Sequence, residues 1–168
     1  MFKNSIIIKP DDIDLILSWL EKKPKRVELL LNSKIDGDLN KTFYKKCLNK
    51  YPTMIFIKTT ENIRFGGYIS VTWPEEFNKR DDKSFIFSLD KGKKYKIKEE
   101  EKENAINYCE DVSFCFGAGC DLYIRNKCTS RDNNRVGYAS YDLPKDYEIN
   151  NGKIYFRVLS HEVYHILY

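Results

Sequence analysis

The sequence has little of what marks an exported, membrane-spanning or disulfide-bonded protein. Its first apolar run, at residues 6–8, covers three residues, which is shorter than the apolar core of a signal peptide. No later segment approaches the roughly 20 apolar residues that a bilayer-spanning helix needs. The five cysteines are odd in number and include no CxxC pair, so we expect reduced thiols. We therefore predict a cytoplasmic chain without a membrane span, and nuclear access stays open.

An excess of charge of one sign is also missing. The net charge is +4, because 29 lysines and arginines are dispersed among 25 acidic residues. Nucleic-acid-binding domains usually gather their basic residues on one face, so nucleic acid is not an expected partner. A DNA-binding regulator is kept as an alternative. The 168 residues fit one domain, and the aromatic content of 14% favours half-buried strands over a helical bundle.

The spacing of apolar residues predicts two helices followed by a series of strands. One helix is expected over residues 12–22 and another over residues 39–48, where Asp38 could serve as the N-cap. The period then changes from near four to two. Strands are predicted at residues 53–58, 65–73, 84–89, 95–97, 121–124 and 154–166. The pattern therefore predicts an α+β fold in which strands predominate.

The segment His161-Glu162-Val163-Tyr164-His165 matches the H-E-x-x-H motif of zinc peptidases. In those enzymes an α-helix brings both imidazoles to one zinc ion, and the glutamate acts as general base. Here the β-branched and aromatic neighbours predict a strand, on which His161 and His165 would lie roughly 13 Å apart. We therefore predict no metal site and no catalytic residue. A zinc-dependent metallopeptidase that uses both histidines, with Glu162 as base, is kept as the alternative.

Cys128 is the candidate redox-active thiol. Lys127 adjoins it, and Arg125 and Arg131 lie within three residues on either side. Positive charge favours the thiolate, so a partly exposed Cys128 would be oxidised faster than a buried cysteine. The alternative is an unreactive cysteine whose basic neighbours point into water. No catalytic signature accompanies this or any other cysteine, so the sequence predicts a protein that is not an enzyme and needs no cofactor.

Two predicted strands contain residues that are unusual in strands. Gly66 and Gly67 indicate a bulge or a close approach of neighbouring groups, and packing is favoured over contact with a ligand. Glu162 is a charged residue in an otherwise apolar segment. It is expected either to face solvent or to pair with a basic residue on the adjacent strand.

Several motifs, taken in their order along the chain, resemble the TLDc domain family. The ending FRVLSHEVYHI resembles the family's last strand, whose signature is an acidic residue, Val and an aromatic. The segment RVELLLNSKIDGD, followed by the helix around residues 43–47, resembles the opening strand and helix, and FCFGAGCDLYI resembles a later glycine-containing segment. The matching signature residues are Phe65, Gly66, Gly67, Asp121 and Glu162. The resemblance covers the chain from about Arg26 to the end.

The resemblance implies an antiparallel two-sheet β-sandwich flanked by a few helices. Residues 1–25 would form an N-terminal helical segment outside the signature, and residues 26–168 would form the TLDc-like domain. The implied function is that of a non-enzymatic protein-interaction module. The resemblance also implies roles in oxidative-stress resistance and in regulating the vacuolar proton-pumping ATPase, whose subunits would be the partners.

Overall fold

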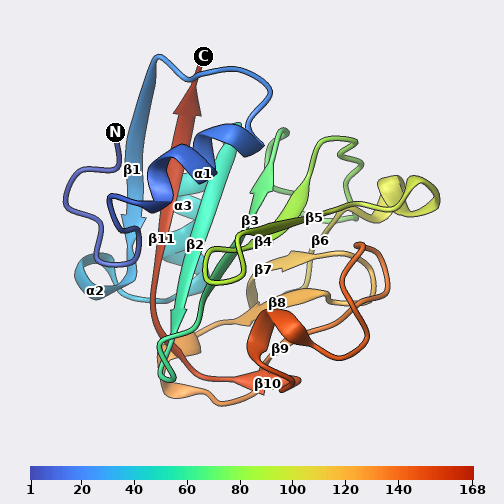
Figure 1. Ribbon diagram of the computed structural model, residues 1–168. Coiled ribbons are helices and arrows are strands. Elements are labelled where there is room, and N and C mark those ends of the chain that lie inside the picture. Colours follow the sequence, from blue (N-terminus) through green and yellow to red (C-terminus); the bar gives the residue numbers. More distant parts are fainter.

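Two antiparallel β-sheets form the body of the protein, which is described here for residues 1–168 from a computed structural model (Figure 1). The six-stranded sheet has the strand order β1-β11-β2-β3-β4-β5, and the five-stranded sheet has the order β10-β9-β8-β7-β6. Apolar side chains from both sheets meet in one core between them. This arrangement confirms the predicted α+β fold and the two-sheet sandwich.

Three short α-helices and three 3₁₀ helices connect or flank the strands. The six-stranded sheet contains β1 (Arg26–Asn32), β2 (Thr53–Thr59), β3 (Arg64–Ile69), β4 (Phe85–Ser88), β5 (Lys93–Lys96) and β11 (Val158–Leu167). The five-stranded sheet contains β6 (Ile106–Asn107), β7 (Val112–Phe116), β8 (Leu122–Arg125), β9 (Asn134–Val136) and β10 (Tyr155–Phe156). The helices are α1 (Asp12–Trp19), α2 (Ser33–Asp36), α3 (Asn40–Cys47), η1 (Glu99–Asn104), η2 (Cys128–Ser130) and η3 (Glu148–Asn150). None of them is both long and apolar enough to cross a bilayer.

The last strand, β11, lies inside the six-stranded sheet, between β1 and β2 (Figure 1). Its residues are buried along most of its length, which explains why the segment reads as apolar. The predicted strand over residues 154–166 is nevertheless two strands. β10 belongs to the five-stranded sheet, and after Arg157 the chain enters the six-stranded sheet as β11. Both parts are extended, so the alternation of side chains does not reveal the change of sheet.

The strand predicted over residues 65–73 ends early, at Ile69. The reason is Asp81, whose carboxylate accepts a hydrogen bond from the Ser70 backbone N–H at 2.6 Å and another from the Ser70 hydroxyl at 2.6 Å. The first of these bonds occupies the Ser70 N–H, which a continued strand would donate to the neighbouring strand. The prediction was therefore wrong beyond Ile69.

Both predicted helices are present. α1 ends at Trp19, three residues before the predicted end, because Leu20 is extended. α3 matches the prediction to within one residue at each end, but its N-cap is Leu39. The Asp38 carboxylate instead accepts hydrogen bonds from the backbone N–H and hydroxyl of Thr129, at 2.9 and 2.6 Å. Asp38 therefore joins the start of α3 to η2 and does not cap its own helix.

A second core lies on the other face of the six-stranded sheet, under the N-terminal segment. Apolar residues of this segment, among them Phe2, Ile16 and Trp19, pack against side chains of β2, β4 and β11. A buried ion pair fastens the same segment, because the guanidinium of Arg64 on β3 contacts the carboxylate of Asp12. Figure 1 shows α1 lying across this face of the sheet. The larger sheet is thus covered on both sides.

Candidate functional site

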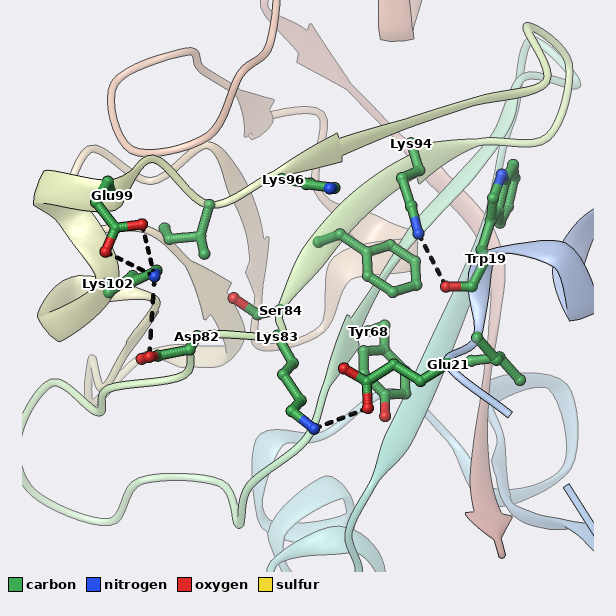
Figure 2. Close-up of a pocket in the computed structure, with 13 residues that line it drawn as sticks. Trp19, Glu21, Tyr68, Asp82, Lys83, Ser84, Lys94, Lys96, Glu99 and Lys102 are labelled. Atoms are coloured by element: carbon green, nitrogen blue, oxygen red, sulfur yellow. Dashed lines mark hydrogen bonds and ion pairs between the residues drawn. The ribbon is translucent and has the colours of Figure 1, made fainter. Parts of the chain in front are cut away.

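A surface cavity of about 390 Å³ lies between the end of α1 and the strands at the edge of the six-stranded sheet (Figure 2). Its apolar wall is aromatic. The rings of Tyr68 and Phe85 stack with centroids 4.9 Å apart and an interplanar angle of 17°. Trp19, the last residue of α1, lines the cavity beside them. We call this cavity, with its lining residues, the lysine pocket, because four lysines line it.

Four lysines surround the lysine pocket, and they differ in whether a carboxylate neutralises them (Figure 2). Lys83 pairs with Glu21 at 2.7 Å, and Lys102 pairs with Glu99 at 2.6 Å. The other two, Lys94 and Lys96, come from the edge strand β5 and have no carboxylate partner. The pocket therefore presents uncompensated positive charge beside an aromatic wall, which suits a carboxylate or another anionic group.

The Lys94 ammonium is held in place although no acid faces it. Its Nζ donates a hydrogen bond to the Trp19 carbonyl oxygen at 2.9 Å and lies 5.0 Å from the centre of the Phe85 ring. Burial, and then the neighbouring charge of Lys96, lower the pKa of Lys94. A lysine whose charge is disfavoured in this way gains from an incoming anion. The sequence pattern does not single out these lysines, since spacing does not reveal which lysines border a cavity.

The signature residues Phe65, Gly66 and Gly67 serve close packing. An added Cβ on Gly66 would lie 1.9 Å from the Ile55 carbonyl oxygen, and one on Gly67 would lie 2.4 Å from Cζ of Phe116 in the other sheet. β2 and β3 pair without a bulge at these positions. Phe65 is fully buried in the core between the sheets. The glycines therefore mark a close approach, and no ligand is needed to explain them.

Asp121, another signature residue, organises a loop. Its fully buried carboxylate accepts hydrogen bonds from three successive backbone N–H groups, those of Ala139, Ser140 and Tyr141, at 2.8, 2.7 and 2.7 Å. Burial raises the pKa of this carboxyl, and the three N–H donors oppose the shift. The side chain thus fixes residues 139–141 to the end of the β7–β8 turn.

Glu162 is buried, and neither of the two expectations for it is correct. It does not face solvent, and no basic residue pairs with it. One carboxylate oxygen accepts from the hydroxyls of Ser5 and Tyr164, at 2.5 and 3.0 Å. The other accepts from the Ile6 backbone N–H at 3.0 Å and from the Asn32 amide at 3.5 Å. Glu162 therefore ties the N-terminal segment to the centre of the six-stranded sheet.

The H-E-x-x-H segment lies in strand β11, as predicted. His161 is buried against Phe114, and burial lowers its pKa to about 4. His165 is partly exposed, and its Nε2 lies 3.1 Å from the Tyr51 carbonyl oxygen. No group of three or more histidine, cysteine or acidic side chains is placed to hold a metal ion. The helix that the zinc chemistry requires is absent, and Glu162 is occupied by its own donors.

Cys128 is not the exposed thiol that the sequence suggested. Its side chain is fully buried, and burial, together with the nearby Asp38 carboxylate, raises its pKa to about 12. Its Sγ lies 3.7 Å from Nδ1 of His161. The thiol is hard to ionise and the imidazole is hard to protonate, so this pair is unsuited to proton transfer. The Cys128 side chain is buried because Lys127 adopts a left-handed backbone conformation, with φ +58°, and Cys128 then turns into the core.

The fold and the signature residues together define the class of protein. Two packed antiparallel sheets are what the resemblance implied, and the signature residue Gly67 lies where one sheet contacts the other. The family model described as TLDc domain matches residues 1–167. The chain therefore belongs to the TLDc domain family. No curated protein matches the chain.

Proposed function

We propose that the chain is a non-enzymatic protein-interaction module that binds a subunit of the vacuolar proton-pumping ATPase and contributes to resistance against oxidative stress. Membership of the TLDc family over residues 1–167 is the observation that carries the proposal. The buried carboxylates of Asp121 and Glu162 support it, because internal donors occupy both. Their role in the fold is to hold surface segments in place, which is what a docking surface requires.

The partner is assigned to the lysine pocket on grounds of charge and shape. Lys94 and Lys96 lie on β5, the outermost strand of the six-stranded sheet, where lysines also discourage non-specific pairing of strands. An acidic loop or helix end of the partner would place a carboxylate near these two ammonium groups and an apolar side chain against Tyr68 and Phe85. Such contacts weaken as salt is added, because exposed charges are screened.

Recovery of the partner from a cell extract tests the proposal. The tagged wild-type chain is expected to retain a proton-pump subunit, identified by mass spectrometry. The double variant Lys94→Glu/Lys96→Glu should retain several-fold less, whereas Lys45→Glu, which changes an exposed lysine of α3, should behave as wild type. Deletion of the gene should also increase sensitivity to peroxide. Failure to recover any pump subunit, together with unchanged peroxide sensitivity, would contradict both parts of the proposal.

A further inference from the structure

The outer face of the five-stranded sheet, the face turned away from the six-stranded sheet, carries a continuous row of side chains. Strand pairing aligns Asn107, Cys115, Tyr123, Arg135 and Tyr155 across all five strands. Side chains alternate along a strand, so Cys115 lies opposite to its neighbours in β7, which point into the core between the sheets. The row therefore lies outside the sandwich core, although Cys115 itself is buried.

Two more cysteines come to this row from the turns that flank β7. Cys109 lies in the β6–β7 turn, and Cys120 lies in the β7–β8 turn. Both influence and are influenced by the Cys115 thiol, whose Sγ lies 3.6 Å from the Gly117 carbonyl oxygen in the β7–β8 turn. Cys109 and Cys120 are partly exposed, and Cys115 is buried beneath them. Three of the five cysteines of the chain thus form one cluster, although neither a CxxC pair nor a disulfide is present.

The cluster borders a second cavity, of about 400 Å³, whose wall is positively charged. Cys109 and Cys120 line it together with Arg125 and Arg135. Arg135 donates to the Gly119 carbonyl oxygen at 3.2 Å, which holds its guanidinium beside Cys120. The Nε atoms of both arginines are buried and have no hydrogen-bond partner. Arg125 pairs with Asp111 at 3.4 Å, whereas Arg135 has no carboxylate partner, so its charge can stabilise a negative charge that forms in the cavity.

Beyond the interaction proposed above, we propose that Cys109, Cys115 and Cys120 form a redox site that hydroperoxides oxidise. The thiolate of Cys109 or Cys120 attacks one peroxide oxygen, the O–O bond breaks, and the sulfur becomes a sulfenic acid while the leaving oxygen takes up a proton. The buried Cys115 thiol then attacks that sulfur, a disulfide forms, and water leaves. Two thiols and one hydrogen peroxide thus give one disulfide and two waters. A dithiol reductant returns the site to its first state.

The surroundings favour the thiolate at the two partly exposed positions. A hydrogen bond from the Cys115 thiol lowers the pKa of Cys109 to about 6 or that of Cys120 to about 7, and its single proton serves one of the two sulfurs at a time. The charge of Arg135 acts in the same direction on Cys120. Thiols with a pKa near the ambient pH are the most effective attacking groups. Cys120 also has a left-handed backbone conformation, with φ +57°, and such strain in a residue other than glycine is common at functional sites.

The remaining two cysteines provide an internal comparison. Cys47 and Cys128 are fully buried in the core between the sheets, and burial raises the pKa of each to about 12. A peroxide in water reaches neither, and neither ionises at neutral pH. Cys115 is also buried, and its pKa lies well above the usual value of a thiol. The structure therefore separates two partly exposed cysteines, Cys109 and Cys120, from three buried ones, of which Cys115 alone interacts with the exposed pair.

Peptide mapping of the purified chain tests the site without any partner. The reduced protein is treated at neutral pH with one equivalent of hydrogen peroxide, free thiols are alkylated, and the products are digested without reductant. Trypsin leaves the three thiols on one peptide, residues 103–125, and chymotrypsin can cut after Phe116, between Cys115 and Cys120. The expected product is a disulfide that joins Cys115 to Cys109 or Cys120, while Cys47 and Cys128 stay reduced.

Variants identify the role of each sulfur. Cys115→Ser should abolish the disulfide and leave a sulfenic acid that dimedone traps, and Cys109→Ser/Cys120→Ser should be oxidised about tenfold more slowly than wild type, since the thiolate fraction falls. A disulfide that involves Cys47 or Cys128, or no disulfide in the wild-type protein, would overturn the proposal. Because the purified chain is used alone, such a result would leave the proposed interaction with the proton pump unaffected.

Discussion

Replacing Glu162 by glutamine is expected to lower the free energy of unfolding by about 2–3 kcal/mol, although the two side chains have nearly the same shape. The carboxylate accepts from four donors, two on each oxygen. The amide of glutamine keeps one oxygen, which can serve the N–H groups of Ile6 and Asn32. Its NH₂ group then faces the hydroxyls of Ser5 and Tyr164.

The Ser5 hydroxyl cannot adapt to this change. Its oxygen already accepts from the backbone N–H groups of Ile7 and Ile8, at 3.1 and 2.9 Å, and donates its only proton to Glu162 at 2.5 Å. A glutamine NH₂ would therefore meet an oxygen with no free lone pair, and the Ser5 proton would lose its acceptor. The loss of one hydrogen bond to a charged acceptor, with a donor left buried, gives the magnitude of about 2–3 kcal/mol.

Urea unfolding of Glu162→Gln and wild type measures this difference, and amide hydrogen exchange locates it. Exchange at residues 6–8 should accelerate, because their backbone hydrogen bonds depend on Ser5 and Glu162. Glu28→Gln, which changes an exposed glutamate of β1, is the matched control and should alter stability by less than about 0.5 kcal/mol. A Glu162→Gln protein as stable as this control, with unchanged exchange at residues 6–8, would refute the reasoning.

Further predictions concern packing, a loop and pH. Gly67→Ala should lower the free energy of unfolding by about 1–3 kcal/mol, because its Cβ would lie 2.4 Å from Phe116. Adding Phe116→Leu should restore part of this free energy in urea unfolding. A Gly67→Ala protein with an unaltered urea midpoint would contradict the contact. Asp121→Ala should lower the free energy of unfolding by about 3–5 kcal/mol and accelerate amide exchange at residues 139–141, whose N–H groups lose their acceptor. Unchanged exchange at these residues would count against the proposed role of Asp121 in holding the loop. Burial lowers the pKa of His161 from 6.5 to about 4, so below pH 6.5 the unfolded chain binds a proton that the folded chain does not. The free energy of unfolding should therefore fall by about 3 kcal/mol as the pH drops from 6.5 to about 4. His161→Gln, but not His165→Gln, should remove this dependence of the free energy of unfolding on pH, as measured by urea unfolding at a series of pH values.

The parts of the fold that the sequence predicts well are those that local alternation determines. β2 and β4 pair with neighbours in the middle of a sheet and are buried except at Lys58, so their apolar runs mark them clearly. The failures have a different physical origin. At Arg157 the chain changes sheets while it stays extended, and after Ile69 a carboxylate eleven residues away takes the next N–H. Neither event leaves a trace in the period of the side chains.

The cysteines show the same limit at a candidate site. Charge close in sequence pointed to Cys128, but backbone conformation at Lys127 decides where that side chain lies. Alternation along β7 did contain the useful signal, since it sets Cys115 apart from the two phenylalanines beside it. The residue pattern does not predict the backbone course of the two turns that bring Cys109 and Cys120 over the same strand. Reactivity therefore follows from turn geometry, which residue spacing does not encode.

A charged residue within an apolar strand allows two structures, and Glu162 shows why the sequence does not choose between them. Either the side chain reaches solvent or the fold supplies donors to a buried carboxylate, and the second case requires several donors at once. Here two of the donors, Ser5 and Ile6, are separated from Glu162 by more than 150 residues, while Tyr164 is two residues away. Only the complete fold brings them together. The acidic residue of the signature is thus best understood as the acceptor that fixes the N-terminal segment to the sheet.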